Sequence, residues 1–127
     1  MTSSDTRPAD GQLASEITEA VVAAFHQYVG QAPAKARTFL NEDLVHVLLE
    51  DTMSTTERQL AATREEEFVL AIRRKFQQTM RNDLIAAVEQ LGGRKVIAFM
   101  SDNHIDPDIA VETFVLEPLQ VSVAADD

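Results

Sequence analysis

Apolar residues recur at helical spacing in two long segments of this chain. In residues 12–29 they recur every three or four positions, which is typical of a helix that buries one face. Residues 65–92 form a second predicted helix of about 40 Å. A helix of this length exceeds what a small sheet covers, which predicts that its far end contacts another chain. Its apolar series is Phe68, Ile72, Phe76, Met80, Leu84, Val88 and Leu91.

Four shorter apolar segments predict strands. Residues 34–40 and 44–50 are separated by Asn41-Glu42-Asp43, whose side chains favour a turn, so they predict a hairpin. Residues 95–102 and 109–117 predict a second hairpin. The segment 44–50 is apolar at successive positions, which predicts that both of its faces are covered, one by a helix and the other by a second subunit.

Several residues mark where the elements begin and end. Gly30 ends the first helix, and Pro33 prevents it from resuming. Ser54 and Glu57 match the capping box that starts a helix, here a short one reaching about Thr63. Glycines at 92 and 93 end the long helix.

The resulting order is α-β-β-α-α-β-β. It predicts an α+β fold in which a four-stranded, mostly antiparallel sheet, built from two β-hairpins, is packed by one long helix and an N-terminal helix. Residues 12–118 are expected to form a single domain. Residues 1–11 and the acidic residues 119–127 are expected to be flexible tails.

Composition narrows the functional classes. The chain has 127 residues, no cysteine and a net charge of −10. Without cysteine it has no disulfide and no cysteine-ligated zinc, and the sequence shows neither a secretory signal nor a membrane span, so we expect a cytoplasmic protein. The lack of a long apolar run predicts no insertion into a membrane. The negative charge predicts no nucleic acid partner and repulsion from anionic lipid surfaces. Ten of the eleven basic residues lie between Lys35 and Lys95, which indicates either a basic face or, as we favour, helices of mixed charge.

The main candidate site lies between the last two predicted strands. Asp102, His104, Asp106 and Asp108 occupy every second position of this segment. Three readings stay open: a structural turn built by Asp106-Pro107-Asp108, which we favour, a loop that binds an anion or polar ligand, and a site for a divalent metal ion. The segment lacks the central glycine and closing glutamate of a calcium loop.

A second candidate segment, which is basic, completes the predicted set of ligand-binding residues. Lys35 and Arg37 follow the turn at Gly30 and could hold an anion, but we favour the simpler interpretation of a capped helix followed by a basic strand start. The segment is not a phosphate-binding P-loop, because it lacks Gly-Lys-Ser/Thr. His46 is interpreted as a core or interface residue. No potential nucleophile is paired with a general base in a recognisable catalytic motif. We therefore predict no catalytic residue, and we also predict no cofactor and no metal.

Several segments resemble the MpsC-like bacterial family, which is named for a sodium-translocating, membrane-potential-generating system. The resemblance covers residues 13–118, and its most specific part is GRKVIAFMSDNH at residues 93–104. The other matching segments are G-x-x-P at 30–33, VLLED at 47–51, TER at 56–58, IRR-x-FQ-x-TMR at 72–81 and DPD at 106–108. Typical members have a Gly-x-Gly-Pro turn at the first of these segments, and this chain has Ala32 in place of its second glycine. The resemblance implies a link to cation or inorganic-carbon transport and transfers no catalytic residue.

Three functional hypotheses follow. The first is an accessory or regulatory protein that docks on a membrane transporter. The second is a sensor that binds a small ligand, an anion or a nucleotide, between residues 30–37 and 102–108 at a subunit interface. The third and least favoured is an enzyme that uses Asp102, His104 and Asp106 as acid, base or metal ligands. Under each of them we expect a homodimer or a larger homo-oligomer.

Overall fold

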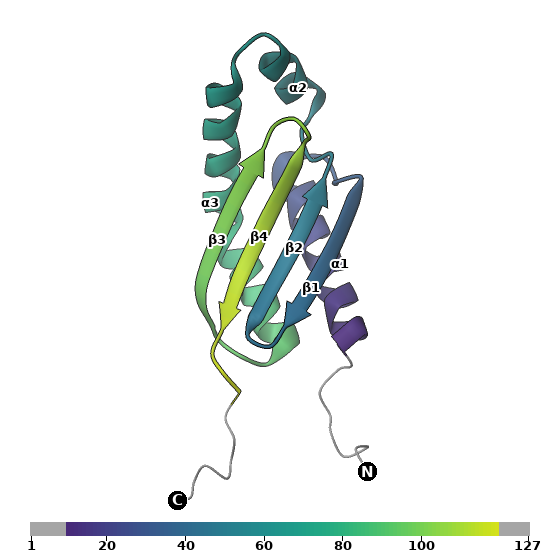
Figure 1. Cartoon of the computed structure of the whole chain (residues 1–127), viewed down its shortest axis with the longest axis vertical. Helices are drawn as coiled ribbons and strands as arrows, with labels where there is room; N and C mark the ends of the chain where they lie inside the picture. Colours follow the sequence, from purple (N-terminus) through teal and green to yellow (C-terminus); the bar gives the residue numbers. More distant parts are fainter. Residues whose placement is uncertain (1–9, 120–127) are drawn as a thin grey trace, which may run out of the picture.

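The computed structural model describes residues 10–119 of the chain. Its elements confirm the predicted order and the α+β class (Figure 1). The first helix begins at Asp10, so Asp10 and Gly11 are helical although the sequence assigned them to a tail. The rest of the two predicted tails, 1–9 and 120–127, lies outside the described residues. The elements are α1 (Asp10–Val29), β1 (Lys35–Asn41), β2 (Leu44–Glu50), α2 (Thr55–Ala62), α3 (Glu66–Gly92), β3 (Val96–His104) and β4 (Ile109–Leu116).

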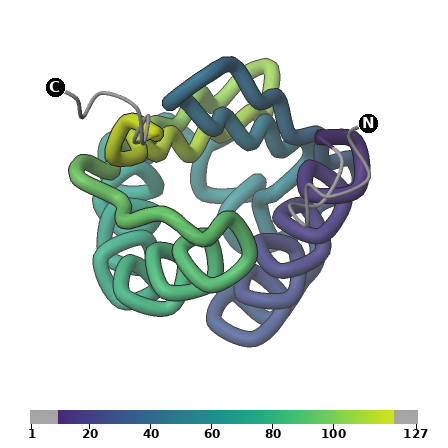
Figure 2. Tube along the Cα trace, turned by 90° about the horizontal axis from the view of Figure 1, so that it is seen from below, coloured from purple at the N-terminus to yellow at the C-terminus, as the bar shows by residue number. Residues whose placement is uncertain are grey.

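The four strands form one antiparallel sheet in the order β1-β2-β4-β3. The two hairpins therefore meet through β2 and β4, and β1 and β3 are the edges. Helices α1 and α3 lie side by side on one face of this sheet, as both views show (Figures 1 and 2). Within residues 10–119, no helix covers the opposite face.

Side chains along β2 and β4 alternate between buried and half-buried positions, and this alternation distinguishes the two faces of the sheet. The inward side chains of β2 and β4 pack against Ile17, Val21 and Phe25 of α1 and Met80, Leu84 and Val88 of α3. Burying each of these side chains stabilises the fold by about 1.5–3 kcal/mol. The side chains between them point away from the helices and form the outer face. On the two central strands this face carries Leu44, His46 and Leu48 of β2 and Val111, Thr113 and Val115 of β4.

The long helix buries a different face from the predicted one in its N-terminal half. Met80, Leu84 and Val88 are buried as expected, but the first turns bury Val69, Arg73 and Gln77. Phe68 is 54% exposed, and Ile72 and Phe76 are only half-buried. The most buried positions in this half therefore lie one residue after the apolar series, and two of the three carry polar side chains, Arg73 and Gln77. Phe76 of the series still packs against the edge of the core.

The corner between α2 and α3 is held by local chemistry. The Ser54 hydroxyl accepts from the Glu57 amide and the Glu57 carboxylate accepts from the Ser54 amide, which confirms the capping box. Arg64 then turns the chain with a positive φ of 69°. The first turns of α3 extend past the end of the sheet, so this corner stands clear of it (Figure 1).

Candidate functional site

The structure does not bring the four predicted loop residues together at one point. Asp102 and His104 lie on the outer face of β3, and Asp106 is exposed in the turn that follows. The ring Nδ1 of His104 lies 2.8 Å from the carbonyl oxygen of Pro107, so the imidazole is engaged within the turn itself. Asp108 faces a different part of the molecule.

Asp108 fastens the β3–β4 hairpin to the segment between β2 and α2. Its carboxylate accepts from the Thr52 hydroxyl at 2.9 Å and from the Met53 amide at 2.8 Å. Its backbone carbonyl accepts from the Asp51 amide at 3.0 Å. These contacts use both carboxylate oxygens, which favours the structural reading of this residue.

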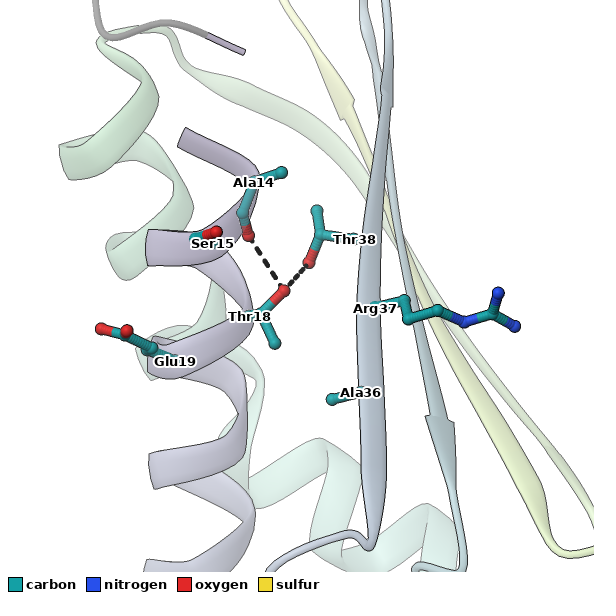
Figure 3. A pocket seen from close by; sticks show the side chains of 7 residues that line it. All are labelled: Ala14, Ser15, Thr18, Glu19, Ala36, Arg37 and Thr38. Carbon is teal, nitrogen blue, oxygen red and sulfur yellow. Dashed lines mark hydrogen bonds between the residues drawn. The ribbon is translucent and has the colours of Figure 1, made fainter. Parts of the chain in front are cut away.

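Lys35 and Arg37 lie at the opposite edge of the sheet from Asp102 and His104. Arg37 points away from α1 (Figure 3), and its guanidinium is 3.8 Å from the Glu50 carboxylate. Three inter-strand steps separate the two edges, which is roughly 14 Å. Within one chain a ligand the size of a simple inorganic anion therefore cannot touch both groups at once. Ligand binding by the six predicted residues stays a prediction.

A shallow hollow of about 370 Å³ lies between α1 and β1 (Figure 3). The hydroxyls of Thr18 and Thr38 are 2.6 Å apart inside it, and Thr18 also donates to the Ala14 carbonyl. These hydroxyls satisfy each other and the helix backbone. The two threonine hydroxyls are thus already engaged, and the other polar residues that line the hollow are Ser15, Glu19 and Arg37.

Sequence reasoning missed a cluster of polar side chains buried between α3 and the sheet. The buried polar cluster, as we call it, is defined by Thr52, Glu57, Arg73, Gln77 and Glu112, each less than 6% exposed. It lies on the inner side of the sheet, at the end nearest α2.

Arg73 is the centre of one half of this cluster. Its guanidinium donates to the Thr52 carbonyl at 3.3 Å and to the Thr52 hydroxyl, and its Nη1 is 3.5 Å from the Glu57 carboxylate. It also lies over the ring of Phe25, 5.8 Å from the centroid. Together these contacts compensate for burying a cation.

Glu112 is the centre of the other half. One of its oxygens accepts from the Ser101 hydroxyl, and the other accepts from the Gln77 amide at 3.3 Å. Gln77 and Asn103 exchange two further hydrogen bonds, of 3.1 and 2.9 Å. Burial raises the pKa of Glu112 from 4.5 to about 7. The hydrogen bonds that Glu112 accepts from Ser101 and Gln77, and the charge of Arg73, act in the opposite direction and lower this pKa.

The sequence did contain a signal for this cluster. Glu112 alternates with Ala110 and Phe114, so it shares the inward face of its strand, where a carboxylate is unexpected. Arg73 and Gln77 continue the helical spacing of Val69 in the same way. A charged residue at an inward position of two facing elements predicts a buried pair or network.

The cluster connects α2, α3 and the sheet through hydrogen bonds. Each of its five side chains is directed at another side chain or at the backbone. Over residues 10–119, no group of three or more His, Asp or Glu side chains is arranged to hold a metal ion.

Comparison with known proteins identifies the family. The model of the family described as "Na+-translocating membrane potential-generating system (MpsC)" matches residues 9–118. The chain belongs to the MpsC family. Searches of curated proteins and of solved structures each found no match. In the part of this MpsC-family chain that is described, no helix is both long enough and apolar enough to cross a membrane.

Proposed function

We propose that this chain is an accessory or regulatory protein of a membrane ion-transport system and that it works by binding a protein of that system. Family membership supports the link to ion transport, because the family is named for a system that translocates Na⁺. The polar residues of greatest chemical interest are engaged within the fold, which supports binding over catalysis.

The observation that carries the proposal is the corner between α2 and α3. Phe68 is 54% exposed in the first turn of α3. Glu65, Glu66 and Glu67 directly precede it and are also exposed. Together they border a hollow of about 620 Å³ whose other wall is Ala61, Ala62 and Arg64. An exposed aromatic side chain beside a hollow is typical of the anchors that dominate protein interfaces.

The charge of this corner indicates the partner. Three consecutive glutamates favour a basic segment, and the cytoplasmic loops of membrane proteins carry an excess of Lys and Arg close to their spanning helices. A net charge of −10 steers the whole chain toward such a segment. The same charge opposes direct binding to anionic lipid, so the contact is with the transport protein.

The test is complementation in cells that lack this chain. The wild-type chain, a Phe68→Ser variant and an Ile97→Ser variant are expressed at equal levels, and the Na⁺-dependent membrane potential is measured with a voltage-sensitive dye. Ile97 is a matched control because it is 61% exposed at the start of β3, far from the corner. We expect the wild type and Ile97→Ser to restore the potential and Phe68→Ser to fail. Full activity of Phe68→Ser would refute the proposed surface.

A further inference from the structure

The outer face of the sheet carries apolar side chains on its two central strands, and no described element covers it. Leu44 and Leu48 of β2 lie beside Val115 and Val111 of β4, in register. Between these two apolar pairs lie His46 and Thr113, whose Nδ1 and hydroxyl oxygen are 3.2 Å apart. Phe39 on β1 and Met100 on β3 continue this surface to the edges and are 48% and 53% exposed. Large contiguous apolar patches on soluble proteins mark interaction sites.

The charges of this face differ from those of the chain as a whole. Its strand positions carry two cations, Lys35 and Arg37, and two carboxylates, Glu50 and Asp102. With neutral histidines their sum is zero, whereas the whole chain carries −10. A second copy therefore meets no net repulsion from these positions.

The two edges of the face carry opposite charges at the same level of the sheet. Strand register places Arg37 opposite Leu48, Leu48 opposite Val111, and Val111 opposite Asp102. One row across the sheet thus begins with a cation on β1 and ends with a carboxylate on β3. In the next row Phe39 and Met100 occupy the same two edges, with His46 and Thr113 between them.

A two-fold axis parallel to the strands, placed between two stacked sheets, pairs these opposite edges. It lays β1 over the partner's β3 and β2 over the partner's β4, so each row faces the same row of the partner with its order from edge to edge reversed. Arg37 then faces the partner's Asp102, Phe39 faces the partner's Met100, and Leu48 faces the partner's Val111. Sheets stack about 10 Å apart with nearly aligned strands, a spacing that these side chains fill from both sides. An axis across the strands instead places the basic edge on the partner's basic edge.

We propose that two copies of this chain form a dimer by stacking their outer faces about a two-fold axis parallel to the strands. Arg37 is available for the contact, because its side chain is 60% exposed and its guanidinium is 3.8 Å from the Glu50 carboxylate, a long separation for an ion pair. The surface is separate from the α2–α3 corner, so one dimer presents two free corners to the transport partner.

Charge reversal tests both the dimer and its axis. The wild type is expected to have twice the 14.0 kDa mass of one chain by light scattering. Arg37→Asp and Asp102→Arg each turn two symmetry-related contacts repulsive, so each is expected to weaken dimerisation by roughly 100-fold. Arg74→Asp, on the exposed side of α3, is the matched control and is expected to leave the dimer intact.

Mixing the two single variants gives the decisive result. In a dimer of one Arg37→Asp chain with one Asp102→Arg chain, both contacts pair opposite charges again. We expect the mixture to form dimers although neither variant does so alone, and circular dichroism to show that both variants are folded. A wild type that stays monomeric would overturn the proposal, as would single variants that dimerise normally or a mixture that stays monomeric.

Discussion

Arg73 on α3 and Glu57 on α2 form a buried ion pair, with 3.5 Å between Nη1 and Oε1 and with side chains that are 3% and 5% exposed. The pair joins the short helix to the long one. The same Glu57 oxygen also accepts from the Ser54 amide at 2.9 Å and so closes the capping box of α2. One carboxylate thus serves both the start of a helix and its attachment to the core.

Replacing Arg73 with Met should therefore destabilise the fold strongly. The substitution leaves the Glu57 carboxylate buried without a counter-charge, which costs about 3–5 kcal/mol. Arg74→Met removes the neighbouring, exposed guanidinium and is expected to change stability by less than about 0.5 kcal/mol. Urea unfolding monitored by circular dichroism measures both values. Equal, small effects of the two substitutions would show that the ion pair contributes little.

The raised pKa of Glu112 predicts a specific dependence of stability on pH. The carboxyl titrates at about 7 in the folded chain and at 4.5 ordinarily, so the folded state holds the proton between these values. Protonated Glu112 therefore contributes about 3 kcal/mol to the free energy of unfolding below pH 4.5. This contribution is lost as the pH rises from 4.5 through about 7.

Glu112→Gln removes this titration while keeping a polar side chain for Ser101 and Gln77. The wild type is expected to lose stability relative to this variant between pH 5 and pH 8, as urea unfolding at the two pH values would measure. The other carboxyl groups titrate in both proteins and cancel in the comparison. Parallel pH profiles of the two proteins would contradict a raised pKa.

The loop between β3 and β4 should respond to substitution at one aspartate and not at the other. Asp108→Ala leaves the Thr52 hydroxyl and the Met53 amide without their acceptor, and we expect a loss of about 2–3 kcal/mol. Asp106→Ala alters an exposed side chain and is expected to have an effect below about 0.5 kcal/mol. A large effect at Asp106 in thermal unfolding would point to a role that the hydrogen bonds do not explain.

The capping box of α2 gives a smaller, local prediction. Ser54→Ala removes the hydroxyl that accepts from the Glu57 amide at 3.2 Å, which should cost about 1 kcal/mol. Thr56→Ala in the same helix is the control, since that side chain is exposed and does not cap the helix. Chemical denaturation of the two variants separates capping from helix propensity.

Much of the fold follows from the sequence because periodicity and end signals agree along the chain. Helical spacing, the capping box at Ser54 and the glycine at 93 fix α2 and the end of α3 to within a residue or two. The apolar strand segments yield the two hairpins. None of these signals depends on contacts between distant residues.

The polar interior could not be predicted in the same way. Assigning only apolar residues to the buried face of α3 selected Phe68 and passed over Arg73, because the partners that make Arg73 tolerable come from Thr52 and Glu57, distant in sequence. Similarly, Asp102 and Asp108 are close in sequence, but the hairpin directs one to the outer face and the other toward Thr52.

Site-specific photo-crosslinking from residue 68 in living cells tests the central claim most directly. A photoreactive amino acid in place of Phe68 should capture a membrane ion-transport protein through a basic segment next to one of its spanning helices, identified by mass spectrometry of the cross-linked peptide. The same amino acid in place of Ile97 should not capture it. Capture of that protein from both positions, or from neither, would contradict the account.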